Sequence, residues 1–269
     1  MMRKYNRVRE ALRTQRPVCG FICRTLSPAA VELIGLCGLD FVWIDMEHST
    51  ADFSTVEHLC RAADAVDLEA LVRVPDQSPS NILRALEAGA GIVNAPQVDD
   101  RSQAESVVRA AKYGPAGERG YSSASRGTRY GVDGAVQEVF AIANERVMTM
   151  VQIESALGAQ NAEEICSVPN LDIVFIGLGD LSQSMGLTGQ LGHPRLVESA
   201  RRILESIVRN GKIPAMHLEK PEAAQEWIDL GVRIVCCGVD LTSLKTALLG
   251  VHKAFGVVRD RQTGTHSGS

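Results

Sequence analysis

Short apolar runs of strand length recur along the chain and alternate with segments of helical periodicity. In the helical segments apolar side chains return every three or four residues, as Ala30, Ile34 and Cys37 do. The strand-like runs are almost continuously apolar, which is typical of strands covered on both faces. The expected strands are Val18–Cys23, Phe41–Met46, Ala70–Val74, Gly91–Val98, Val147–Glu154, Leu171–Gly177, Ile213–Leu218 and Arg233–Gly238.

The intervening segments predict helices, and polar residues at their starts support the boundaries. Ser54, with Glu57 three residues later, forms a capping-box pattern and is the expected N-cap. Either Asp100 or Ser102 is the expected N-cap further along. The expected helices are Ser27–Cys37, Ser54–Ala65, Ser80–Ala88, Ser102–Ala111, Gly134–Asn144, Ala156–Cys166, Leu196–Val208, Pro221–Leu230 and Leu241–Phe255.

Strand–helix alternation of this kind predicts an α/β fold with a parallel sheet, and eight strands close it into a (β/α)8 TIM barrel. The 269 residues suit one such domain, which we expect at residues 1–258. An open doubly wound sheet is the alternative, but the turn after its first strand, Cys23–Pro28, lacks the Gly-x-Gly-x-x-Gly pattern of a dinucleotide site. Residues 261–269 contain no apolar side chain, so we expect a disordered tail over 259–269.

Composition narrows the class of protein. Hydrophobic residues make up 45% of the chain and charged residues 22%, which suits a soluble domain with a core. The net charge of -4 argues against a nucleic-acid or anionic-membrane partner, and no apolar stretch is long enough to span a bilayer. Seven scattered cysteines without a Cys-x-x-Cys pair predict reduced thiols, and the charged start does not resemble a signal peptide, so we expect a cytoplasmic protein.

Reactive side chains gather at the carboxyl ends of the expected strands. In a barrel this is the end where active sites lie. Because the amino ends show no comparable collection, the sequence predicts a site at the carboxyl face. The residues concerned are Asp45, Glu47 and His48 after the second strand, Arg73 on the third, Asn94 and Gln97 near the fourth, Gln152 and Glu154 on the fifth and Asp180 after the sixth.

Glu154 and Asp180 end two consecutive strands, where buried carboxylates are costly without a cation or partner. Two carboxylates with amide oxygens and waters suit a hard cation such as Mg²⁺ or Mn²⁺. Alternatively, the two carboxylates pair with Arg73 and Arg119, or they cap the helices that follow. Residue type and spacing leave both interpretations open.

The other polar residues also allow two interpretations each. His48 near Asp45 is either a general base oriented by a carboxylate or a histidine at a helix start with no chemistry. Arg73 lies in an apolar strand and needs an anion, which is either a substrate oxygen that gains charge or a structural ion pair. The basic loop Gly117–Arg126 in the long connection before the fifth strand either binds a carboxylate or forms a solvated lid.

Five co-linear motifs resemble the HpcH/HpaI aldolase family of class II, pyruvate-dependent aldolases in the phosphoenolpyruvate/pyruvate barrel superfamily. The resemblance runs from about residue 15 to 255, with matching gaps. The motifs are Asp45-Met46-Glu47-His48, Leu71-Val72-Arg73-Val74-Pro75, the segment Lys112–Gly120, Val151-Gln152-Ile153-Glu154, and the segment Phe175–Ser182.

The resemblance implies a carbon–carbon lyase, an aldehyde-lyase that reversibly cleaves a 4-hydroxy-2-oxo acid to pyruvate and an aldehyde through a metal-bound enolate. It implies that Glu154 and Asp180 hold a divalent metal, Mg²⁺ or Mn²⁺, with Co²⁺ as a further candidate. It also implies that the carboxylate of pyruvate meets backbone N–H groups around Gly179 and Asp180. The substrate is accordingly a small oxo acid.

The resemblance assigns roles to further residues. Arg73 steadies the keto oxygen as it becomes an enolate, and His48, oriented by Asp45, moves the proton. Gln152 supports the substrate site, and Arg119 in the basic loop is a candidate substrate-binding residue.

Departures from the family pattern bear on substrate and direction. Leu178 stands where many members have proline, and the residues from Arg119 to Gly131 resemble those of members that run a condensation, such as the citrate synthase of staphyloferrin B biosynthesis. A citrate-synthase-like condensation of oxaloacetate with acetyl-CoA is therefore one alternative, and a non-catalytic barrel with structural ion pairs is another. The resemblance also implies a homo-oligomer, often a hexamer with an exchanged C-terminal helix, although the apolar segment Leu241–Val258 also suits an ordinary eighth helix.

Overall fold

A closed barrel of eight parallel strands forms the centre of the molecule, which is described here by a computed structural model covering residues 5–132, 134–219 and 221–262. Each strand pairs with the next in sequence, and β8 pairs with β1 to close the sheet. The predicted α/β barrel and its strands are confirmed. The strands are β1 (Val18–Cys23), β2 (Phe41–Asp45), β3 (Glu69–Arg73), β4 (Ile92–Ala95), β5 (Met148–Ile153), β6 (Ile173–Ile176), β7 (Ile213–His217) and β8 (Ile234–Val239).

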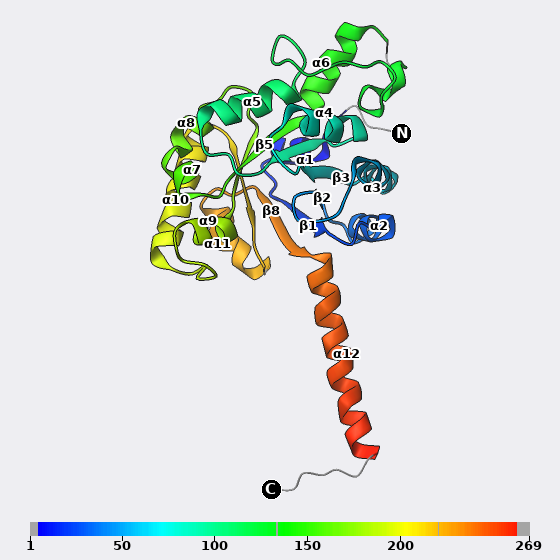
Figure 1. Ribbon diagram of the computed structural model, residues 1–269, viewed down its shortest axis with the longest axis vertical. Helices are drawn as coiled ribbons and strands as arrows, with labels where there is room; N and C mark the ends of the chain where they lie inside the picture. Colours follow the sequence, from blue (N-terminus) through cyan, green and yellow to red (C-terminus); the bar gives the residue numbers. More distant parts are fainter. Residues whose placement is uncertain (1–4, 133, 220, 263–269) are drawn as a thin grey trace.

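Helices alternate with the strands and cover the outside of the barrel (Figure 1). The described helices are α1 (Arg7–Arg13), α2 (Pro28–Leu36), α3 (Phe53–Ala65), α4 (Pro79–Ala88), α5 (Arg101–Ala111), α6 (Val136–Arg146), α7 (Ala156–Gln160), α8 (Ala162–Cys166), α9 (Leu178–Ser184), α10 (Pro194–Arg209), α11 (Ala224–Asp229) and α12 (Asp240–Gln262), with short 3-10 helices η1 (Arg126–Gly131) and η2 (Pro221–Ala223).

Helix starts were predicted with mixed success. Asp100 caps α5 by accepting a hydrogen bond from the backbone N–H of Gln103 at 2.9 Å, as one of the two predictions required. The prediction of Ser54 as an N-cap was wrong, because α3 begins at Phe53 and Ser54 lies within the helix. Its N-cap is Asp52, whose carboxylate accepts a hydrogen bond from the backbone N–H of Thr55 at 2.7 Å.

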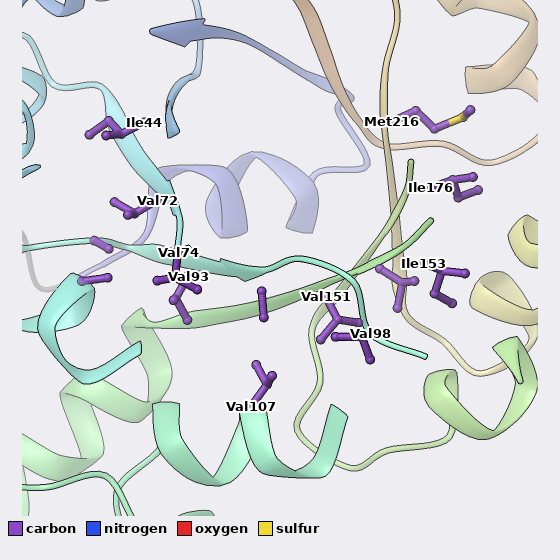
Figure 2. Close-up of a cluster of buried hydrophobic side chains, with 14 of the residues drawn as sticks. Ile44, Val72, Val74, Val93, Val98, Val107, Val151, Ile153, Ile176 and Met216 are labelled. Carbon is purple, nitrogen blue, oxygen red and sulfur yellow. The ribbon is translucent and has the colours of Figure 1, made fainter. Parts of the chain in front are cut away.

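Two apolar clusters hold the fold together. The inner cluster fills the barrel with alternate side chains of the strands, among them Phe41, Leu71 and Met150. The outer cluster lies between the strands and the helices, and Figure 2 shows Val107 of α5 pointing toward the strands, near Val151 of β5. Because the inner cluster fills the barrel from below, the polar residues at the carboxyl ends of the strands are left at its mouth.

Helix α12 projects away from the barrel rather than packing against it (Figure 1). Its large apolar side chains are exposed, with Leu248 at 59% and Phe255 at 65% of their full accessibility. The helix continues to Gln262, so the start of the tail expected over 259–269 is helical, and residues 263–269 lie outside the described residues. None of the helices in the described part of the chain has the length and apolar character needed to cross a membrane.

Candidate active site

A cavity of about 660 Å³ opens at the carboxyl ends of the barrel strands. Most of the residues predicted for the site line it, while Asp45 lies beneath it and reaches it through Arg73. Arg119 is not among the lining residues. The predicted residues that line the cavity are His48, Arg73, Gln152, Glu154, Gly179 and Asp180.

Asp45 and Arg73 form the buried centre of one wall. They are register partners on β2 and β3, and Arg73 donates from Nε and Nη2 to the two carboxylate oxygens of Asp45 at 2.9 and 2.6 Å. Burial alone would raise the pKa of Asp45, but the hydrogen bonds and charge of Arg73 outweigh it and hold the pKa below its ordinary value. Asp45 is therefore a fixed anion that orients the guanidinium of Arg73 toward the cavity.

His48 lies at the rim of the same wall. Asp45 accepts hydrogen bonds from the backbone N–H groups of Glu47 and His48 at 3.1 and 3.2 Å, so it fixes the main chain there. The imidazole itself has Glu47 as its nearest carboxylate, at 3.8 Å between Nε2 and Oε2. Glu47 in turn forms an ion pair with Nη1 of Arg73 at 2.8 Å. Asp45 therefore contacts the backbone of His48 and not its ring, and the carboxylate beside the ring is that of Glu47.

Glu154 is buried directly after β5, where it accepts two hydrogen bonds. The backbone N–H of Gln97 donates to one oxygen at 2.7 Å, and Nε2 of Gln152 donates to the other at 2.7 Å. Gln152 is oriented by Asn94, which donates to its amide oxygen at 2.7 Å. Burial, together with the negative charges of Glu47 and Asp180, raises the pKa of Glu154 to about 7.

Asp180 faces Glu154 from the first turn of α9, where it is exposed. The backbone N–H groups in the first turn of a helix have no partner within the helix, so those around Gly179 are available to a carboxylate. Gly177 allows the two strand ends to approach, since a Cβ added there would lie 2.6 Å from the Cβ of Glu154. Helix α9 was not predicted, because a single seven-residue segment shows too little periodicity.

The ion-pair interpretation of the two carboxylates is wrong for the described part of the chain. Arg73 pairs with Asp45 and Glu47 there, and neither Glu154 nor Asp180 has an ion-pair partner among the described residues. A buried carboxylate with amide support, facing a second carboxylate, fits a hard divalent cation that keeps several waters. The described residues contain no cluster of three or more His, Cys, Asp or Glu side chains that could hold a metal ion.

Arg119 is buried away from the cavity, contrary to the predicted role in substrate binding. Its Nη2 donates to Glu87 of α4 at 2.8 Å, and the guanidinium lies 4.7 Å from the ring centre of Tyr113. Helix α4 ends at the opposite end of the barrel from the cavity, because it starts after the carboxyl end of β3. The ion pair therefore ties the long β4–β5 connection to the bottom of the barrel.

Replacing Arg119 by alanine should consequently weaken the fold and not the substrate site. Leaving Glu87 without its partner is expected to lower the free energy of unfolding by about 2–4 kcal/mol. Urea denaturation measures this loss, with Arg84→Ala on the exposed face of α4 as the control. A raised KM for pyruvate at unchanged stability would contradict the structural role.

Arg24 and His217 line the cavity but were not predicted as site residues. Nε of Arg24 donates to Asp45 at 2.9 Å, and Asp240 accepts the backbone N–H of Arg24 at 2.9 Å. Burial lowers the pKa of His217, and the nearby charges of Arg24 and Arg73 lower it further, whereas Glu219 opposes them. The alternation of side chains along β1 and β7 could have predicted that both residues point into the barrel. It does not indicate which residues they meet there.

Comparison with known proteins places the chain among aldolases. The family model of HpcH/HpaI aldolase/citrate lyase matches residues 21–247. The 5-keto-4-deoxy-D-glucarate aldolase of Klebsiella pneumoniae is 32% identical over 93% of this chain and 96% of its own. The 4-hydroxy-2-oxo-heptane-1,7-dioate aldolase of Escherichia coli is 31% identical over 93% and 95%.

One solved structure is similar in both fold and sequence. The crystal structure of the citrate synthase SbnG superposes with a TM-score of 0.82 at 27% identity and covers 95% of this chain and 97% of its own. The family model spans most of the residues, and the site residues lie within the matched range. This chain therefore belongs to the HpcH/HpaI aldolase/citrate lyase family.

Proposed function

We propose that this protein is a metal-dependent class II aldolase, a carbon–carbon lyase that reversibly cleaves a 4-hydroxy-2-oxo acid to pyruvate and an aldehyde. The observation that carries the proposal is the buried carboxylate of Glu154, with its pKa raised to about 7, beside Asp180 in the cavity that Arg73 also lines. The names of the aldolase relatives, among them a 4-hydroxy-2-oxo-heptane-1,7-dioate aldolase, support the reaction class.

Glu154 and Asp180 would hold the divalent cation. When bound, the cation supplies a Lewis acid that stabilises negative charge on a substrate oxygen. We propose Mg²⁺ or Mn²⁺, because the available ligands are oxygens.

A cytoplasmic location agrees with the seven free cysteines.

Arg73 acts on the substrate oxygen that gains charge when the carbon–carbon bond breaks. Its guanidinium is already oriented by Asp45 and Glu47, so little reorganisation accompanies the reaction. Backbone N–H groups at the start of α9, around Gly179, bind the pyruvate carboxylate. Gln152 fixes Glu154 through the hydrogen bond from its Nε2.

His48 moves the proton of the 4-hydroxyl group. It is exposed at the rim, and its Nε2 lies 3.8 Å from Oε2 of Glu47. In cleavage the imidazole accepts the hydroxyl proton, and in the reverse direction it returns the proton to the new alkoxide. A bridging water suits this transfer, because His48 stands at the solvent side of the cavity.

The direct test is pyruvate release from a 4-hydroxy-2-oxo acid, followed by coupled reduction of pyruvate. Release is expected to stop after thorough chelation and to return with Mn²⁺. Release that persists without any divalent ion would reject the metal-dependent mechanism. Absence of release from a broad panel of oxo acids would reject the aldolase.

A second candidate function is the condensation of oxaloacetate with acetyl-CoA on the same site. The structural similarity to the citrate synthase SbnG favours it. An enolate held by the same residues would then attack a different electrophile. The assay is release of free thiol from acetyl-CoA in the presence of oxaloacetate, and no thiol release would reject this candidate.

We propose further that the protein is a homo-oligomer, and a hexamer is the assembly that the family resemblance implies. Helix α12 carries exposed Leu244, Leu248 and Phe255 and projects from its own barrel (Figure 1), so a second copy would cover them.

Charge on α12 is accordingly expected to break the assembly. Leu248→Glu should reduce the mass measured by light scattering to that of a smaller species, because a charged side chain opposes burial of the helix. The matched control is Leu157→Glu on α7, where leucine is also exposed, at 53%. A wild-type protein that is monomeric at high concentration would contradict the proposal.

A further inference from the structure

The cavity has an apolar arm that the proposed chemistry does not use. Its walls come from the segment after β6, from α10 and from the β7–α11 region, which lie away from Asp45 and Glu47 on β2. Leu191 is 42% exposed, whereas Leu218 and Trp227 are buried at 7% and 8%. The residues that form the apolar arm are Leu178, Leu191, Val197, Leu218, Ala223 and Trp227.

The cations that line the cavity already have carboxylate partners. Among the described lining residues the guanidinium groups are those of Arg24 and Arg73, and both are bonded to Asp45. Arg73 also has Glu47 as a partner. A second carboxylate on the substrate would therefore have to compete with Asp45 and Glu47 for these two guanidinium groups, whose positive charge is already balanced.

The charged residues beside the apolar arm are acidic. Glu219 and Glu226 line the cavity on the side of Leu218 and Trp227. Glu226 is paired with Arg201 at 2.8 Å, and Glu219 is exposed after β7. The charge of Glu226 is balanced by Arg201, so it is the negative charge of Glu219 that opposes a carboxylate in the apolar arm.

We propose that the acceptor half of the substrate is an apolar, uncharged aldehyde, which the apolar arm binds. This inference rests on the proposed aldolase function and narrows its substrate class. Burying an alkyl or aryl group against leucine and tryptophan is favourable by about 0.8 kcal/mol per methylene. A carboxylate there would lose its hydration without gaining an unpaired arginine among the described lining residues. The chain thereby differs from the relative named for a heptane-1,7-dioate, whose name specifies two carboxylates.

The test compares aldehydes in the addition of pyruvate, with Mn²⁺ present. Hexanal and succinate semialdehyde are similar in length but differ in the terminal carboxylate. The kcat/KM for hexanal is expected to exceed that for succinate semialdehyde by about tenfold or more. A preference for succinate semialdehyde would overturn the inference.

Hydrogen–deuterium exchange at the methyl group of pyruvate separates this inference from the proposed function. Exchange reports enolate formation without any aldehyde. If the methyl protons of pyruvate exchanged but succinate semialdehyde were the preferred aldehyde, the inference of an apolar acceptor would be overturned and the proposed aldolase function would stand. Absence of both exchange and addition would overturn the aldolase function and the inference with it.

Variants locate the preference in the apolar arm. Leu191→Ala should lower the ratio of kcat/KM for hexanal to that for acetaldehyde about fivefold, because acetaldehyde is too short to fill the arm. Leu157→Ala, which removes another exposed leucine on α7, should leave the ratio unchanged. An unchanged ratio in Leu191→Ala would place the acceptor elsewhere and overturn the inference.

Charge at the arm gives an independent check. Glu219→Lys should raise kcat/KM for succinate semialdehyde about fivefold at low salt, with a smaller effect at high salt. Lys220 follows directly and lies outside the described residues, so Lys220→Ala is measured in parallel. If wild type did not prefer hexanal and Lys220→Ala did, Lys220 would be a group that binds the substrate carboxylate, and the inference would be overturned.

Discussion

Replacing Glu154 by glutamine is expected to abolish Mn²⁺ binding while leaving the barrel folded. Glutamine keeps the shape of the side chain and an oxygen that accepts the backbone N–H of Gln97, but it removes the negative charge that faces Asp180. Loss of one of the two proposed charged ligands should weaken the affinity by about hundredfold or more. Calorimetric titration with Mn²⁺ measures the change.

The same carboxylate makes the affinity depend on pH. Because the pKa of Glu154 is raised to about 7 before metal binds, the cation must displace a proton below that pH. The apparent affinity is expected to fall about tenfold per pH unit below 7 and to be nearly constant above it. Titrations at several pH values check this, and Glu154→Gln should remove the slope.

Without metal, the free energy of unfolding should fall as the pH rises, whereas the metal affinity rises with pH. The pKa of Glu154 is higher in the folded protein, about 7, than its ordinary value of 4.5, so the folded state holds a proton that the unfolded chain has lost between these values. The stabilisation is complete below pH 4.5 and is lost as the pH rises to 7, by up to about 3 kcal/mol. Metal-free Glu154→Gln should therefore be more stable than wild type at pH 8.

Glu164→Gln is the matched control for these measurements, because Glu164 is exposed on α8. It should change neither the Mn²⁺ affinity nor the pH dependence of unfolding. If wild type and Glu154→Gln bound Mn²⁺ equally well, the two carboxylates would have no part in metal binding, and the non-catalytic barrel would be the better interpretation.

The strands were predictable because each is an apolar run buried on both faces, and their order follows from the barrel. Their ends depend on local backbone chemistry. The fourth strand was expected to reach Val98 but ends at Ala95. Pro96 has no N–H to continue the ladder, and Gln97 turns the chain with a φ of 54°. That turn directs the backbone N–H of Gln97 to Glu154, so the error in the strand boundary lies beside the candidate site.

The site was predictable where it depends on strand order and was not where it depends on distant packing. Asp45, Arg73 and Glu154 follow from the rule that reactive residues lie at the carboxyl ends of barrel strands. Arg119 was misassigned because the path of the long β4–β5 connection, which brings it to Glu87, is not encoded in any short motif.

Replacing Arg73 by lysine is expected to lower kcat by about 10² to 10³ with little change in the KM for pyruvate. Lysine keeps the positive charge but cannot make the three contacts of the guanidinium, which are two to Asp45 and one to Glu47. The ammonium would settle on Asp45 and no longer reach the substrate oxygen. Exchange of the pyruvate methyl protons should slow by the same factor, because it reports enolate formation alone.

A structural role for Arg73 makes a different prediction. Asp45 is fully buried, so disrupting its partner would mainly lower the free energy of unfolding. The melting temperature and the Mn²⁺ affinity of Arg73→Lys are therefore measured with kcat, and Arg84→Lys on the exposed face of α4 is the control. A destabilised protein whose folded fraction exchanges pyruvate protons at the wild-type rate would show that Arg73 only neutralises Asp45. A folded, metal-binding protein with slow exchange would identify Arg73 as the group that stabilises the enolate oxygen.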